Sequence, residues 1–255
     1  MRIPTPFLPP LRWFAFGLLT WLLSLWAHQH PDWVERWYSR GLFQGLRGLL
    51  DSTLGRLPVP AFYLFWAGVA GYWAWVIWRG TPFGHFRQRL LYWALRVAGF
   101  AGLMLGLFFW LWGFNYARPT LAEQLRLHPQ PLDSAALWQE LYAETRILDS
   151  LRVRLLGPDT NALDDKRFWP MHAEDTVRAA VQHWLRREGF PTGGRVRAHF
   201  IPPEGLLFRF GTAGIYWPFV GQGNLEAGLH PLRQLPVMAH EMSHGYGFTD
   251  EGEGW

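Results

Sequence analysis

The sequence of 255 residues contains no cysteine. Disulfide bonds and thiolate metal ligands are therefore excluded, and any bound zinc would have to be held by histidine and carboxylate side chains. Charged residues make up only 17% of the chain. The three longest apolar segments contain no acidic residue and no lysine, groups that transport sites within a membrane generally need, so a transporter is disfavoured.

Apolar and aromatic residues are abundant instead. Aromatic side chains form 17% of the sequence, and 17 of them are tryptophan. The segments 11–27, 60–78 and 90–114 each offer close to the roughly 20 apolar residues that cross a bilayer core. We therefore predict three transmembrane helices within residues 1–114. The first is expected to be a retained anchor, because it is rich in tryptophan and no small-residue cleavage site follows it.

The distribution of arginine predicts the orientation. Arg79, Arg87 and Arg89 lie in the short loop between the second and third segments, and basic residues in short loops mark the cytoplasmic side. This places the N-terminus in the cytoplasm and residues 115–255 outside. The loop 28–57 carries four arginines and three acidic residues, and it favours the opposite orientation.

The net charge of +4 needs no nucleic-acid partner, because topology and contact with lipid explain the excess of arginine. The predicted partner is the lipid bilayer. Within the first loop, apolar residues recur at helical spacing between Trp33 and Leu50. This pattern predicts an amphipathic helix on the outer membrane surface.

Residues 115–255 have the composition and size of a soluble domain. Apolar residues recur at helical spacing after Asp133, which predicts a first helix there, and a second helix is predicted over 173–187. The period then changes to that of strands, which we predict at 195–200, 206–210, 215–220 and 224–230. A polar loop is expected over 161–170. Helices, a small sheet and a final helix indicate an α+β domain, in the general order of zincin peptidases.

The last predicted helix carries His240-Glu241-Met242-Ser243-His244. Residues four apart share one face of a helix, so both imidazoles can bind one Zn²⁺. The adjacent Glu241 can take a proton from water held at the metal, which is the chemistry of peptide hydrolysis. Pro231 and Pro236 precede the motif, and glycines follow it, as expected at the two ends of a helix.

Too few apolar residues surround this motif for its helix to span a membrane, so the site is predicted in the extramembrane domain. A third protein ligand is required. Asp250, Glu251 and Glu253 are all candidates, and Asp250 completes a spacing seen in metzincins. An acidic residue here can also cap a helix or face solvent.

Four stretches make the chain resemble the DUF3810 family of bacterial membrane proteins with zincin-like motifs: residues 38–42, 112–119, 216–219 and 240–248. The resemblance implies a multi-pass protein of the bacterial cytoplasmic (inner) membrane with a metallopeptidase-like C-terminal domain outside. In related gluzincins, the ligand glutamate lies four residues before a supporting Asp or Asn. That register selects Glu251 as third ligand, followed by Glu253 and then Asp250.

The resemblance is incomplete at the end of the chain. Members typically continue Glu-x-Glu-Ala-Asn, whereas Gly254 and Trp255 stand in place of the Ala-Asn pair. We therefore expect a domain truncated at its C-terminus.

These patterns predict a membrane-anchored zinc metallopeptidase. His240, His244 and Glu251 would bind the metal, Glu241 would activate water, and the substrate would lie along an edge strand, either 215–220 or 224–230. Tyr216 and His230 are candidates to stabilise the oxyanion, although each residue type is more often structural. The alternative is a non-catalytic binding or scaffolding protein that retains the fold.

Overall fold

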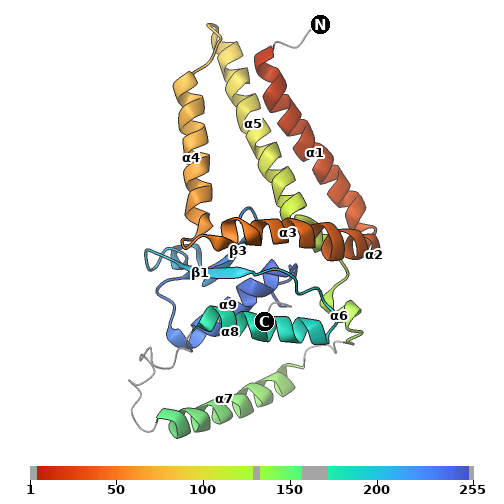
Figure 1. Ribbon diagram of the computed structural model, residues 1–255, viewed down its shortest axis with the longest axis vertical. Coiled ribbons are helices and arrows are strands. Elements are labelled where there is room, and N and C mark those ends of the chain that lie inside the picture. The colour runs from red at the N-terminus through yellow and green to blue at the C-terminus, as the bar shows by residue number, and fades with distance from the viewer. Residues whose placement is uncertain (1–4, 129–132, 157–171, 253–255) are drawn as a thin grey trace.

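The computed structural model describes residues 5–128, 133–156 and 172–252. Long apolar helices form one end of the molecule, and a smaller sheet-containing part forms the other (Figure 1). The predicted polar loop over 161–170 lies outside the described residues.

Three helices are long and apolar enough to cross a membrane: α1 (Leu8–His28), α4 (Ala61–Arg79) and α5 (Phe86–Leu111). The three predicted segments are therefore confirmed as helices of suitable length and composition. The third helix ends earlier than predicted, because the chain turns at Trp112 into the short helix η4 (Gly113–Ala117). In Figure 1, the start of α1 and the α4–α5 connection lie on the side opposite the sheet.

Helices α1 and α5 form a close pair through small residues. A Cβ atom added to Gly17 would lie 2.4 Å from the Cα atom of Gly102, and one added to Gly99 would lie 2.5 Å from the carbonyl oxygen of Pro10. Glycine at such positions lets two membrane helices approach closely. Helix α4 meets this pair differently, through aromatic contacts such as the stacked rings of Tyr72 and Phe100, with centroids 5.5 Å apart.

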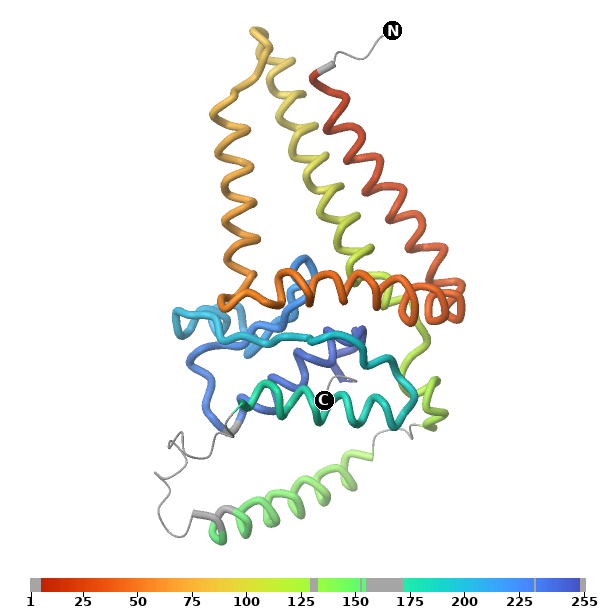
Figure 2. The backbone as a smooth tube through the Cα atoms, viewed as in Figure 1, coloured from red at the N-terminus to blue at the C-terminus, as the bar shows by residue number. Residues whose placement is uncertain are grey.

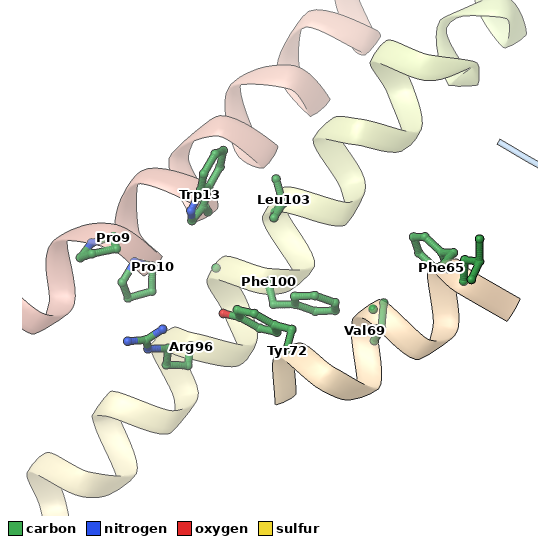
Figure 3. Close-up of a pocket in the computed structure, with 12 residues that line it drawn as sticks. Pro9, Pro10, Trp13, Phe65, Val69, Tyr72, Arg96, Phe100 and Leu103 are labelled. Carbon is green, nitrogen blue, oxygen red and sulfur yellow. The ribbon is translucent and has the colours of Figure 1, made fainter. Parts of the chain in front are cut away.

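A cavity of about 480 Å³ lies between α4 and the α1–α5 pair. Figure 3 shows side chains from the three helices around it, with Val69 and Tyr72 on α4 and Phe100 and Leu103 on α5. The guanidinium of Arg96 also lines this cavity and lies 5.1 Å from the ring centroid of Tyr92.

The connection between α1 and α4 lies across the ends of the long helices, between them and the sheet (Figure 2). It consists of α2 (Pro31–Trp33), the π-helical η2 (Val34–Leu42), α3 (Phe43–Ser52) and η3 (Leu54–Arg56). The helix predicted here is thus present as several consecutive helical segments. Trp33, Trp37 and Leu49 are exposed, as an amphipathic surface helix requires.

The opposite face of this connection packs on the sheet-containing part. Arg47 is 2% exposed, donates to the carbonyl oxygen of Gly193 and lies 4.7 Å from the ring centroid of Tyr246. The side chain of Gln222 accepts from the backbone N–H of Ala61 and donates to the carbonyl oxygen of Leu54, both at 3.0 Å. These contacts join the start of α4 to the sheet.

The sheet has the order β1-β3-β2 and is formed by β1 (Arg197–Ile201), β2 (Gly214–Trp217) and β3 (Gln222–Glu226). Strands β1 and β3 are parallel, and β2 pairs antiparallel with β3. Of the two strands considered as an edge for substrate, β3 is therefore central and only β2 is an edge.

The strand predicted over 206–210 is wrong, since the chain forms the short helix η7 (Phe208–Phe210) there. The reason is the buried carboxylate of Glu226, which accepts hydrogen bonds from the backbone N–H groups of Gly205 and Leu207 at 2.6 and 2.7 Å. These bonds hold the segment in turns. An apolar run alone does not distinguish such a segment from a strand.

Two helices complete this part, α8 (Ala173–Arg187) and α9 (Pro231–Gly245). Helix α9 contacts all three strands and α8, around a core that includes Leu185, Val196, Leu225 and Met242. Apolar periodicity within residues 173–187 predicts that Val177, Ala180, Val181 and Trp184 are buried, but Ala180 is exposed. The short α6 (Leu121–Gln124) and the long α7 (Ser134–Leu156) precede α8. Helix α7 confirms the helix predicted after Asp133.

Candidate metal centre

Helix α9 brings the histidines of the motif together. It begins at Pro231 and ends at Gly245, and Gly247 then adopts a φ of +94°, a conformation that favours glycine at the end of a helix. Met238 and Met242 are buried in the core. His240 and His244, one turn apart, are also buried, with 4% exposure each, and line a cleft.

Three side chains converge in this cleft. The Nε2 atoms of His240 and His244 are 3.1 Å apart. The Oε2 atom of Glu251 lies 2.9 Å from Nε2 of His240, and its Oε1 atom lies 3.7 Å from Nε2 of His244. The three ligand atoms lie within 4.8 Å of one another, so this group could hold a metal ion.

The orientation of His244 suits a metal ligand. Its Nδ1 atom lies 2.7 Å from the carbonyl oxygen of Phe248, so Nδ1 carries the proton and donates it to this acceptor. The lone pair of Nε2 then faces His240. Burial lowers the pKa of His244, which favours the neutral imidazole that metals bind.

Glu241 lies in the same cleft and is 4% exposed. Burial, together with the negative charge of Glu251, raises the pKa of Glu241 to about 8. Two glycines make room for its side chain. A Cβ atom at Gly214 would lie 2.5 Å from Oε1 of Glu241, and a Cβ atom at Gly223 would lie 2.7 Å from its Cβ atom.

The cleft has a volume of about 710 Å³ and three walls. Helix α9 forms one wall, and the edge strand β2 with its following turn forms another. The third wall consists of Phe108 in the long apolar helix α5, together with Trp112 and Tyr116, which follow that helix.

The end of α5 also supports the motif directly. The indole Nε1 of Trp112 donates to the carbonyl oxygen of His244 at 2.8 Å. The guanidinium of Arg118 donates to the carbonyl oxygen of Gly247 at 3.1 Å and pairs with Glu35 at 2.8 Å. Asn115 is fully buried beside Gly247.

The structure brings together four of the predicted site residues, namely His240, Glu241, His244 and Glu251. Asp250 is exposed, and its carboxylate accepts a hydrogen bond from the backbone N–H of Gly252 at 2.7 Å. Glu253 lies outside the described residues.

Tyr216 and His230, the two candidates for stabilising the oxyanion, differ in position. Tyr216 borders the cleft, but its ring packs against Trp112 and the charges that act on it belong to Arg47 and Asp51 of α3, which favours a packing role. His230 is exposed just before α9 and does not line the cleft.

Tyr116 was not predicted as a site residue, yet it lines the cleft beside Glu251. Burial and the charge of Glu251 raise the pKa of its phenol, which therefore remains a hydrogen-bond donor at neutral pH. Its only signal in the sequence is the stretch 112–119 that supports the family resemblance.

The sequence profile described as "Protein of unknown function (DUF3810)" matches residues 38–254. The comparisons with curated proteins and with solved structures gave no match.

Proposed function

This chain belongs to the DUF3810 family, a family of unknown function, and we propose from its site that it is a membrane-anchored zinc-dependent peptidase. The observation that carries the proposal is the convergence of His240, His244 and Glu251 beside the buried carboxylate of Glu241. A sheet with a free edge strand, followed by a helix that bears both histidines, is also the order of elements in zincin peptidases.

The donor set fits zinc. Two ligands of a tetrahedral zinc ion, each about 2.1 Å from the metal, are separated by about 3.4 Å. The two imidazole nitrogens here are 3.1 Å apart, and they lie 2.9 and 3.7 Å from the two different carboxylate oxygens of Glu251, which is on either side of that value. Two imidazoles and one carboxylate leave a fourth position open, as in catalytic rather than structural zinc sites.

Zinc would polarise the scissile carbonyl group and make water at the site more acidic. A cation held by the adjacent ligands would lower the raised pKa of Glu241, so that its carboxylate would accept the proton from the attacking water and deliver it to the leaving amine. The edge strand β2 would align the substrate by hydrogen bonds between backbones. The phenol of Tyr116 would donate a hydrogen bond to the oxygen that becomes negative during the reaction.

The three apolar helices would anchor this site to the cytoplasmic membrane of a bacterium, with the sheet-containing part on the extracytoplasmic side. Its substrates would be peptides or proteins at that surface. The arrangement of the chain is compatible with this topology, since the start of α1 and the α4–α5 connection, which Arg79, Arg87 and Arg89 flank, lie at the end opposite the sheet (Figure 1).

One observation favours the alternative, a non-catalytic binding or scaffolding protein. The side chain of Glu251 is 81% exposed, in contrast to the two buried histidines. An exposed third ligand is held less firmly than a buried one, and a weak metal site would support binding rather than turnover.

The test combines metal content with hydrolysis. The full chain, purified in detergent, should hold about one zinc per molecule, and His240→Ala should lose it. Glu241→Gln should keep the zinc and lose hydrolysis of a quenched-fluorescent peptide library. Unchanged hydrolysis by Glu241→Gln would exclude the role assigned to this carboxylate, and zinc without any hydrolysis would favour the alternative.

A further inference from the structure

The candidate cleft extends along a membrane-spanning helix. Phe108 belongs to the last turn of α5, a helix long and apolar enough to cross a membrane, and it lines the same cleft as His240 and Glu241. Trp112 and Tyr116 continue this wall toward the metal ligands. A site built only for water-soluble peptides has no need of an apolar wall from a membrane helix.

The turn after β2 reaches the second membrane wall. Phe219 lines the cleft, and its ring stacks on Phe65 of α4, with centroids 4.8 Å apart. Phe65 in turn lines the cavity of about 480 Å³ between α1, α4 and α5. One aromatic pair therefore connects the candidate catalytic cleft with a cavity inside the membrane-spanning region.

The lining of that cavity selects an apolar occupant. Val69, Phe100 and Leu103 are among the apolar residues that line it (Figure 3). Its charged side chain, Arg96, lies over the ring of Tyr92, one helical turn toward the far end of α5. Most of the residues that line the cavity are thus apolar.

The size of the cavity selects a slender occupant. Its volume lies in the range of pockets for small molecules, roughly 300–1,000 Å³. A transmembrane helix with its side chains is about 10–12 Å across and some 30 Å long, which is far larger. A fatty acyl chain is flexible and narrow enough to lie between the helices.

We propose that the substrate is an acylated peptide, whose peptide part lies along β2 while its acyl chain passes the Phe65–Phe219 pair into the cavity between α1, α4 and α5. This inference rests on the proposed peptidase function. The membrane helices then take part in substrate recognition as well as anchoring, because they hold the acyl chain while the cleft holds the scissile bond.

The test is photolabelling of the full chain in phosphatidylcholine vesicles. The probe is a peptide with a palmitoyl chain on its terminal amine and a diazirine near the end of that chain. Mass spectrometry should find the label on the segments of Phe100 and Leu103, and excess unlabelled palmitoyl peptide should abolish it. The same peptide without its acyl chain should not compete.

Two variants provide the matched comparison. Val69→Trp fills the cavity. It should lower the specific labelling, which is the part that unlabelled palmitoyl peptide abolishes, by about tenfold, the effect expected when apolar contacts are blocked. Ala70→Trp places the same side chain on a neighbouring, exposed position of α4 that does not line the cavity, and it should leave the label unchanged.

Three results would overturn the proposal. The label could spread evenly over the lipid-facing residues without competition, or a diazirine-labelled phosphatidylcholine could occupy the cavity equally well, which would indicate a lipid site. A transmembrane peptide could also compete as effectively as the palmitoyl peptide.

The photolabelling requires neither zinc nor hydrolysis, so the two proposals can fail separately. If the palmitoyl probe specifically labels the cavity of a protein that binds no zinc, the proposed peptidase function is overturned and recognition of an acylated peptide is supported. Zinc-dependent hydrolysis of free peptides without specific labelling would support the peptidase and overturn the acylated substrate.

Discussion

The indole nitrogen of Trp112 donates a hydrogen bond of 2.8 Å to the carbonyl oxygen of His244, a residue 132 positions later in the chain. The two rings also meet edge to face, with centroids 6.0 Å apart. The end of an apolar helix that is long enough to span a membrane therefore touches a candidate metal ligand directly. The position of the second histidine depends on how α5 ends as well as on helix α9.

Trp112→Phe keeps most of the ring but removes this donor. The carbonyl oxygen of His244 still accepts from the backbone N–H of Gly247 at 2.9 Å, so the effect should be moderate. Losing one hydrogen bond of about 1 kcal/mol should weaken zinc binding about fivefold, measured by competition with a chelator. Trp110→Phe is the control, because Trp110 donates to Thr20 within the α1–α5 pair and should leave zinc affinity unchanged.

The third ligand can be identified by paired amide substitutions. Glu251→Gln removes a carboxylate that lies 2.9 Å from His240 Nε2, and it should weaken zinc binding by at least about a hundredfold. Asp250→Asn changes the adjacent acid and should alter zinc affinity by less than about twofold, because the amide oxygen can still accept from Gly252. The opposite ranking would make Asp250 the ligand.

Gly214 tests whether Glu241 must occupy its observed position. An alanine Cβ atom there would lie 2.5 Å from Oε1 of Glu241, so the carboxylate must move. Gly214→Ala should keep zinc but lower peptide hydrolysis by about a hundredfold, the scale of general-base catalysis. Gly48→Ala is the matched control, since a Cβ atom at Gly48 meets nothing within 4 Å. Equal loss in both variants would argue against a positional role for Gly214.

Tyr116→Phe removes the phenol beside Glu251 while leaving the ring in the cleft wall. If this phenol stabilises the oxyanion, kcat should fall by about a hundredfold while KM changes little. Zinc content should stay the same. A fall in zinc content instead of kcat would show that Tyr116 supports the metal ligands.

The three long apolar helices could be predicted because their signal is local. About 20 consecutive apolar residues specify a spanning helix with no information about its neighbours. The same holds for His240 and His244, whose spacing on one helix places them together. The prediction of a strand at 206–210 was wrong, because the conformation of this segment depends on a distant residue. The carboxylate of Glu226 accepts hydrogen bonds from the backbone N–H groups of Gly205 and Leu207.

The surroundings of the site could not be predicted for the same reason. Trp112 and Tyr116 reach the cleft only when the end of α5 packs against α9, which periodicity does not encode. The sheet order β1-β3-β2 likewise depends on pairing between distant segments, and it decides that β2 rather than β3 is the edge. Local patterns thus predicted that the two histidines of α9 lie together, whereas long-range packing determines the walls of the cleft.

Glu226 gives a prediction of pH dependence away from the candidate metal ligands. Its side chain is fully buried, and burial alone would raise the pKa of the carboxyl. Hydrogen bonds from the backbone N–H groups of Gly228, Gly205 and Leu207 outweigh burial and lower this pKa below its ordinary value near 4.5. The folded state therefore favours the carboxylate. Its stabilising contribution is fully present above pH 4.5 and is lost as the pH falls through the lowered pKa of the folded state.

Glu226→Gln removes the charge but keeps the shape of the side chain. At neutral pH, we expect the free energy of unfolding of the variant to be about 2 kcal/mol smaller than that of the unmodified chain. This is the scale of hydrogen bonds to a charged acceptor. As the pH falls below 4.5, the difference should shrink, because the carboxyl of the unmodified chain becomes neutral as well. Denaturant unfolding in detergent, with metal removed from both proteins, measures the difference at each pH. A difference that stays constant down to pH values well below 4.5 would mean that the charge of Glu226 does not hold the turns around β3.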